Sequence, residues 1–67
     1  MNINTTQLQI AMAERRMSLT QLSERSGVAK QNISTIIRRG TCTPKTAGKL
    51  AAGLNVSVKE IVKEGAT

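Results

Sequence analysis

The sequence contains no Phe, Trp or Tyr, no His and no Asp, and it has one proline and one cysteine among its 67 residues. Without aromatic residues, a core has to be built from Leu, Ile, Val, Met and Ala, which favours small helices packed closely together. The single cysteine, Cys42, excludes an intramolecular disulfide and therefore a secreted scaffold held by disulfides. No metal or redox motif surrounds Cys42, so we expect it to be a packing or incidental residue.

Long apolar runs are also missing from the chain. No stretch approaches the roughly 20 apolar residues that a helix needs to span a bilayer. The first residues, MNINTTQLQIAMAERRM, do not combine a charged start with an apolar run, so they do not resemble a signal peptide. We therefore expect a soluble, cytoplasmic domain without a membrane partner.

The missing residue types argue against an enzyme. There is no His or Asp to act as an acid or base, and only four Glu are present. The chain has no glycine-rich phosphate loop and no pair of metal ligands at helical spacing. It is also too short to enclose a substrate pocket of about 300–1,000 Å³. The sequence thus predicts no catalysis, no cofactor, no metal and no small-molecule ligand.

The charge that is present is unevenly distributed. The formal net charge is +6 and the sequence pI is about 10.5. No acidic residue lies between Glu24 and Glu60, and this interval contains seven basic residues: Arg25, Lys30, Arg38, Arg39, Lys45, Lys49 and Lys59. A basic middle with acidic residues at its borders favours a polyanionic partner, DNA or RNA first. The alternative is a solvated surface that happens to be basic.

Cap motifs and apolar periodicity divide the chain into five short helices, at about residues 5–15, 19–25, 29–39, 44–54 and 58–63. Capping boxes are indicated by three pairs of residues: Asn4 with Gln7, Ser18 with Gln21, and Ser57 with Glu60. Thr43 followed by Pro44 is typical of a helix start. Left-handed helix ends are expected at three residues: Gly27, Gly40 and Asn55. The expected fold is all-α, with residues 1–67 forming one compact five-helix domain.

A spacing in the middle of the chain is typical of a helix-turn-helix. A large and a small residue on one helix precede a glycine turn, and branched aliphatic residues follow on the next helix. These residues are Leu22, Ser23, Gly27, Val28, Ile33 and Ile36. An ordinary helical hairpin whose glycine is a C-cap is the alternative.

The outward face of the helix at 29–39 favours the first interpretation. With the isoleucines inward, this face presents Lys30, Gln31, Asn32, Ser34 and Thr35, and it carries no acidic residue. Amide side chains pair with adenine, lysine donates to guanine, and a threonine methyl group contacts thymine. A face meant only for solubility would more often alternate Glu and Lys. We therefore interpret these five side chains as base-reading residues.

Residues on either side of this helix are candidates for DNA backbone contacts. Ser18 and the N-terminus of the helix at 19–25 would hold a phosphate through backbone N–H groups. The opposite side would use Arg38, Arg39, Thr41, Thr43, Lys45 and Thr46. The apolar residues Val58, Ile61 and Val62 could serve both the core and a homodimer seam, and monomer and dimer both remain open.

The segments MSLTQLSERSGVAKQNISTIIRRG and TPKTAGKLAAGLNVSVKEIV resemble the lambda-repressor/Cro-type helix-turn-helix domains, also called the XRE family. The resemblance runs from about Leu8 to Val62. It differs where the family usually has alanine, at Ser23, and in one extra residue before Gly40. The resemblance implies a five-helix lambda-repressor-like fold and a helix at Lys30–Arg39 that enters the major groove. It also implies a usually two-fold dimer on a pseudo-palindromic site.

Three functions are consistent with these observations. The favoured one is a sequence-specific regulator of transcription that binds double-stranded DNA and resembles a small Cro-like repressor of a phage or mobile element. The second is a protein-interaction module, such as an antitoxin or antirepressor, on the same fold. The third is a cationic peptide acting on membranes, against which the capped short helices and the lack of Trp or Phe anchors argue.

Overall fold

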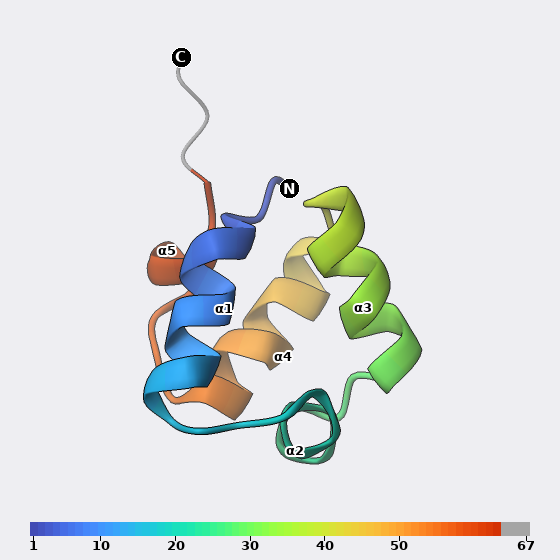
Figure 1. Cartoon of the computed structure of the whole chain (residues 1–67). Coiled ribbons are helices and arrows are strands. Elements are labelled where there is room, and N and C mark those ends of the chain that lie inside the picture. Colours follow the sequence, from blue (N-terminus) through green and yellow to red (C-terminus); the bar gives the residue numbers. More distant parts are fainter. Residues whose placement is uncertain (64–67) are drawn as a thin grey trace.

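The computed structural model describes residues 1–63 and contains five helices in this range (Figure 1). They are α1 (Thr5–Glu14), α2 (Leu19–Ser26), α3 (Lys30–Arg39), α4 (Pro44–Leu54) and α5 (Val58–Ile61). The fold is all-α, which confirms the expected class, and the first four helices lie within one residue of their expected ends. Within the described part of the chain, no helix has both the length and the apolar character needed to cross a membrane.

Local capping explains where the helices begin. The Ser18 Oγ accepts a hydrogen bond from the Gln21 N–H at 3.2 Å, and the Gln21 Oε1 accepts one from the Ser18 N–H at 3.0 Å. This reciprocal pair is the expected capping box at the start of α2. At α1, the Asn4 Oδ1 accepts from the Gln7 N–H at 3.1 Å. Each helix start is therefore set by polar residues that lie three positions apart in the sequence.

The fifth helix is shorter than the sequence predicts. It ends at Ile61 rather than at residue 63, because Val62 is extended and pairs with Ile3 in an antiparallel bridge. Its start also differs: the Ser57 Oγ accepts from the Lys59 N–H at 3.3 Å, not from the N–H of Glu60 as a capping box requires.

The core is a single aliphatic cluster. Its thirteen buried members are Ile3, Leu8, Ala11, Met12, Leu22, Val28, Ile33, Ile36, Ala47, Leu50, Ala51, Leu54 and Ile61. Among residues 1–63, no polar or charged side chain is buried. Ile61 is fully buried, and Val58 and Val62 pack partly buried against the same cluster. The homodimer seam expected at Val58, Ile61 and Val62 is therefore not supported, because the domain's own core uses these side chains.

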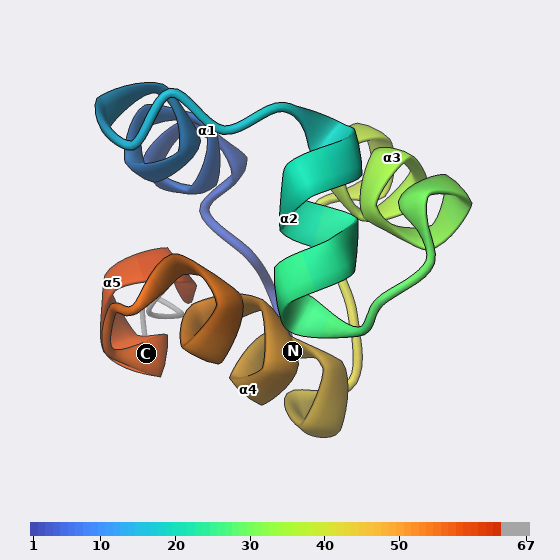
Figure 2. The ribbon, with the colours of Figure 1, turned by 90° about the horizontal axis from the view of Figure 1, so that it is seen from below.

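Helix α2 crosses α3 and α4 steeply. Figure 1 looks almost along the axis of α2, while α3 and α4 run across the view, and Figure 2 shows α2 from the side. The turn into α3 is left-handed at Gly27, with φ of +75°. The Gly27 N–H donates to the Ser23 carbonyl at 2.9 Å, and the Ser26 Oγ accepts from the Val28 N–H at 3.2 Å. This sharp turn is the expected helix-turn-helix connection.

The first four residues form an extended segment that we call the N-terminal strap (residues 1–4). It lies between the loop after α3 and the segment after α5, and it bridges residue 41 on one side and residue 62 on the other. Four backbone hydrogen bonds hold it: Ile3 N–H to Gly40 O at 2.7 Å, Asn4 N–H to Ile61 O at 2.8 Å, Cys42 N–H to Met1 O at 3.0 Å, and Lys63 N–H to Asn2 O at 2.9 Å. No local sequence pattern predicts this strap.

Candidate nucleic-acid interface

Helix α3 lies at the edge of the molecule with one face free. Ile33 and Ile36 point into the core, with 0% and 5% of their surface exposed. The five expected base-reading residues lie on the other side and, together with Arg38, line one open surface depression: Lys30, Gln31, Asn32, Ser34 and Thr35. Four of the five side chains are exposed, and Thr35 is half-buried. Burial of the two isoleucines thus places the expected residues together on the free face.

The two ends of α3 differ in how their backbone groups are satisfied. Its N-cap residue, Ala29, makes no side-chain cap, so the first N–H groups have no capping partner, and they lie at the positive end of the helix dipole. At the other end, the left-handed Gly40 donates its N–H to the Ile36 carbonyl at 2.6 Å. The start of α3, which carries Lys30, is therefore its electropositive end and suits a negatively charged partner.

One candidate base-reading side chain is partly engaged within the helix. The Thr35 hydroxyl donates to the Gln31 carbonyl at 3.0 Å. Because this bond uses its only hydroxyl proton, Thr35 offers a partner its methyl group and its oxygen lone pairs. A methyl group is the part of threonine that contacts thymine in the major groove.

A second depression separates α3 from the start of α4. Four threonines line it, together with Asn32, Ile36 and Cys42: Thr35, Thr41, Thr43 and Thr46. The Thr43 Oγ1 accepts from the Thr46 N–H at 3.2 Å and donates to the Thr46 Oγ1 at 2.9 Å. Thr43 therefore acts as the cap of α4, and its hydroxyl proton is already used. Thr46 retains a hydroxyl proton that it can donate to a phosphate.

A third depression lies between the end of α3 and the N-terminal strap. Arg38, Arg39 and Thr41 line it, as does Lys63, which is not among the residues predicted from the sequence. No local signal marked Lys63, because only long-range pairing through the strap brings it beside α3. Arg38 belongs to both the first and third depressions, and Thr41 to both the second and third. The three depressions therefore form one continuous surface.

Two candidate phosphate-binding residues line none of these three depressions. Ser18 is exposed at the N-terminus of α2, where its capping box leaves the N–H groups of the next two residues without a side-chain partner. Lys45 is exposed in the first turn of α4. The structure thus brings the remaining candidates together and leaves these two at separate helix starts.

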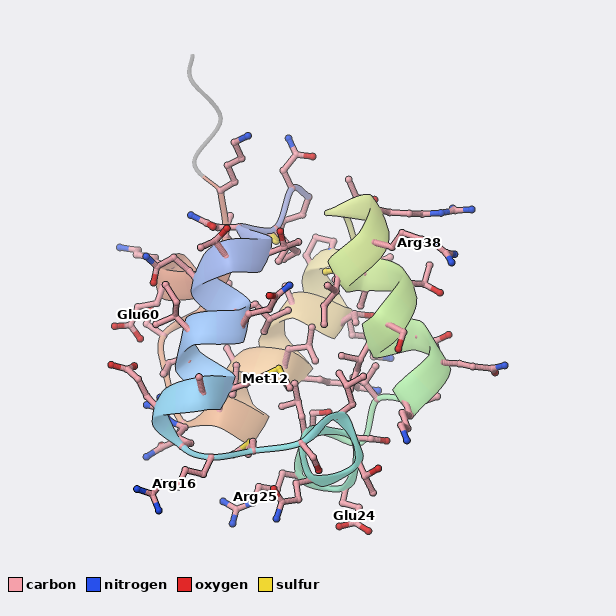
Figure 3. All side chains as sticks on the ribbon, viewed as in Figure 1. Met12, Arg16, Glu24, Arg25, Arg38 and Glu60 are labelled. Atoms are coloured by element: carbon pink, nitrogen blue, oxygen red, sulfur yellow. The ribbon has the colours of Figure 1, made fainter. Side chains whose placement is uncertain are left out.

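Acidic side chains lie away from this surface. The three described glutamates lie on α1, α2 and α5, and none lines the three depressions. Figure 3 shows Glu60 and Glu24 on parts of the molecule distant from Arg38. A polyanion approaching α3 therefore meets basic and neutral polar side chains.

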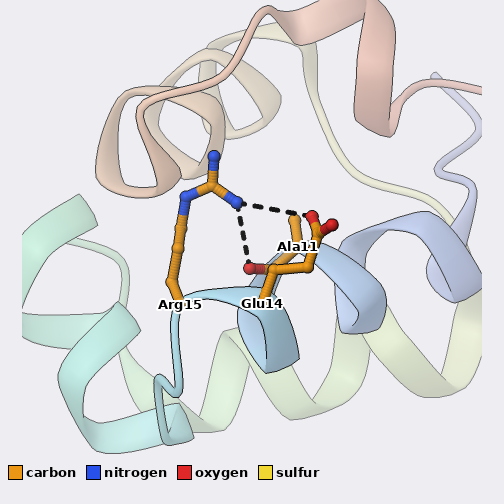
Figure 4. A network of polar contacts seen from close by, with 3 residues as sticks. All are labelled: Ala11, Glu14 and Arg15. Carbon is orange, nitrogen blue, oxygen red and sulfur yellow. Dashed lines mark hydrogen bonds and ion pairs between the residues drawn. The ribbon is translucent and has the colours of Figure 1, made fainter.

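The one ion pair within residues 1–63 closes the end of α1. The Arg15 Nη1 donates to the Ala11 carbonyl at 3.2 Å and lies 3.8 Å from the Glu14 Oε1 (Figure 4). Arg15 is exposed, so the pair contributes little to stability, about 0–1 kcal/mol. Its role is local, because the guanidinium adds a second hydrogen bond to the Ala11 carbonyl, which also accepts the Arg15 backbone N–H at 3.3 Å.

The thiol of Cys42 has a perturbed pKa. Burial raises the pKa of its thiol above the ordinary value, and the positive charge of the amino terminus lowers it in part. A raised pKa keeps the thiol protonated and poorly nucleophilic. Residues 1–63 also hold no group of three His, Cys, Asp or Glu side chains able to bind a metal ion.

The chain was compared with known protein families. A family model described as a Cro/C1-type HTH DNA-binding domain matches residues 7–63. The match includes α2, α3 and the turn between them. No curated protein and no solved structure matched the chain.

Proposed function

The chain belongs to the Cro/C1-type helix-turn-helix DNA-binding domain family, and we propose that it is a sequence-specific regulator of transcription that reads double-stranded DNA with α3. The observation that carries the proposal is the acid-free outer face of α3. On that face, side chains with paired donors and acceptors lie next to Arg38. Among polyanionic partners, a DNA duplex fits this arrangement, because it presents base edges to the paired donors and acceptors and phosphates to the arginine.

The base contacts follow from the chemistry of each side chain. The amides of Gln31 and Asn32 each offer a donor and an acceptor, the pattern that adenine presents in the major groove. Lys30, at the electropositive start of α3, donates to the acceptors of guanine. Thr35 supplies a methyl group for thymine, and Ser34 can contact either kind of base. Specificity would then come from side chains within the first two turns of α3.

The phosphate contacts would position α3 without reading sequence. The start of α2 at Ser18 would hold one phosphate through free backbone N–H groups and the helix dipole. On the other side, the contacts would come from Arg38, Arg39, Thr41, Lys45 and Thr46. Thr43 would act indirectly, by fixing the start of α4, because Thr46 already takes its hydroxyl proton.

Regulation would follow from occupancy. A domain of this size that sits in the major groove blocks the same segment of DNA for other proteins, so we propose a small Cro-like repressor of a phage or mobile element. If two copies bind together, their half-sites would lie about 10–10.5 base pairs apart, centre to centre.

The proposal is tested by selection from a random duplex pool at about 150 mM salt, followed by sequencing. Enrichment of a motif supports sequence-specific binding, and a two-fold repeat of that motif indicates a dimer. Salt-sensitive binding without any motif would contradict specific reading, because it leaves only the electrostatic contribution. Absence of duplex binding would overturn the proposal in favour of a protein-interaction module.

A further inference from the structure

The depression between the N-terminal strap and the end of α3 lies beyond the helix-turn-helix itself. We propose that this depression binds one further backbone phosphate of the duplex and that Lys63 is the side chain that adds this contact. The inference rests on the proposed function, since it extends the same DNA-binding surface. It adds a residue from the end of the fold to contacts otherwise made by α2, α3 and the start of α4.

Three cations meet at this depression from two distant parts of the sequence. Arg38 and Arg39 reach it from the last turn of α3, and Lys63 reaches it from the segment after α5. The depression has a volume of about 390 Å³, and among residues 1–63 no acidic side chain lines it. A site with several positive charges and no internal counter-charge favours an anion.

The strap fixes Lys63 relative to α3. The Lys63 N–H donates to the Asn2 carbonyl at 2.9 Å, and the next strap residue, Ile3, donates to the Gly40 carbonyl at 2.7 Å. Two adjacent backbone hydrogen bonds therefore connect residue 63 to the residue that ends α3. Ile3 is 3% exposed and anchors this connection in the core. Lys63 is thus held in place by the fold, although its side chain is exposed.

The depression is continuous with the face that would read bases. Because Arg38 lines both, a duplex that contacts Lys30 and Thr35 would also lie next to the depression. The ten residues of α3 span about 15 Å, which places the depression at the opposite end of the helix from Lys30. Duplex DNA carries one phosphate charge per about 1.7 Å of its axis, so a fixed cation beside the groove lies close to phosphates.

The test compares Lys63→Gln with Lys59→Gln on the selected duplex. Both changes remove one positive charge from an exposed lysine near α5, but Lys59 does not line the depression. We expect Lys63→Gln to reduce the slope of log K against log salt by about 0.9, as for one lost phosphate contact. We expect Lys59→Gln to leave the slope unchanged. Equal slopes for the two variants would overturn the inference, since they would indicate net charge alone.

A scan of neutral methylphosphonate linkages along the duplex locates the phosphate. In the wild-type protein, we expect one linkage outside the base-reading segment whose neutralisation weakens binding. With Lys63→Gln, neutralising that linkage should weaken binding less than it does in the wild-type protein, because only Arg38 and Arg39 then remain at the depression, whereas the other sensitive linkages should keep their full effect. If every linkage weakens the variant as much as it weakens the wild type, Lys63 contacts none of them and the inference fails.

These outcomes separate the inference from the proposed function. If the wild-type protein selects a motif but the two lysine variants behave alike, only the Lys63 contact is contradicted. If the wild-type protein binds no duplex, both the proposed function and the inference are contradicted. Thermal unfolding of both variants is the control for folding. We expect it to be unchanged, because each substitution keeps the backbone N–H and alters an exposed side chain.

Discussion

Gly53 of α4 lies directly against Ser26, the last residue of α2. A Cβ atom on Gly53 would come within 2.9 Å of the Ser26 Cβ and within 3.0 Å of its Cα and backbone nitrogen. The neighbouring atoms are backbone and Cβ, which cannot rotate away. The missing side chain at position 53 therefore lets α4 approach the end of α2, from which the chain turns into α3.

We expect Gly53→Ala to lower the free energy of unfolding. Overpacking costs about 1–3 kcal/mol and is offset only in part by the gain of about 1 kcal/mol in helix propensity. Gly48 is the matched control: it lies in the same helix, and a Cβ there meets no atom within 4 Å. Gly48→Ala should therefore raise the free energy of unfolding by up to about 1 kcal/mol. Urea unfolding of both variants measures the two changes in the free energy of unfolding. Changes of the same sign would contradict the close approach of Gly53 to Ser26.

The strap gives a second prediction about stability. Ile3 is 3% exposed, and we expect Ile3→Ala to cost about 2–5 kcal/mol through lost burial and a cavity. Ile10 is 44% exposed on α1, so Ile10→Ala should change the free energy of unfolding by no more than about 0.5 kcal/mol. The measurement is thermal unfolding by circular dichroism. Similar midpoints for the two variants would mean that the strap does not contribute to the core.

Gln31→Ala should alter specificity. Loss of a side chain that pairs with one base should cost about 1–3 kcal/mol on the preferred site and relax the choice at one base pair. Gln9→Ala, an exposed glutamine on α1, is the control and should leave binding unchanged. Repeating the selection with each variant measures the preference at every position. An equal loss on all sequences would instead make Gln31 a backbone contact.

Arg39→Ala should weaken binding almost equally on all sequences. An arginine that contacts a phosphate contributes through counterion release, so its loss should flatten the salt slope by about one. Titration of the preferred and a scrambled duplex over a range of salt concentrations measures both effects. An unchanged slope would argue against the contact, and a loss confined to one base pair would make Arg39 a base-reading residue.

The environment of Cys42 predicts slow alkylation. Burial raises the pKa of its thiol, and the thiolate is the form that reacts with iodoacetamide. At a pH of about 8, the folded protein should therefore react more slowly than the same protein unfolded in urea, whose thiol has its ordinary pKa. The difference should narrow as the pH rises above the raised pKa. Mass spectrometry measures the rates, and equal rates at pH 8 would contradict the shift.

Much of the fold was predictable because its signals are local. The caps at Asn4, Ser18 and Thr43 each act on an N–H group three residues further on, so a short window of sequence contains the whole interaction. The outer face of α3 was predictable for a related reason. Once Ile33 and Ile36 are assigned to the core, helical periodicity fixes which side chains point outward.

The features that the sequence did not predict depend on contacts between distant residues. The early end of α5 follows from the pairing of Val62 with Ile3, 59 positions earlier in the chain. The proposed contact of Lys63 depends on the neighbouring hydrogen bond from its N–H to the Asn2 carbonyl. Gly48 and Gly53 look alike in sequence, and only the path of α2 distinguishes the crowded position from the open one. The end of α1 uses Arg16 in a left-handed conformation, with φ of +51°, where no glycine or asparagine marks it.

The N-terminal strap can pair with both of its partners only late in protein synthesis. During translation, Ile3 leaves the ribosome long before Val62 has been made, so the strap cannot pair on both sides until residues 61–63 emerge. Helices α2, α3 and α4 are close in sequence and can associate earlier. A chain cut short before residue 61 would therefore keep α3 but expose Ile3 and the α1 surface that faces α5 to cellular proteases.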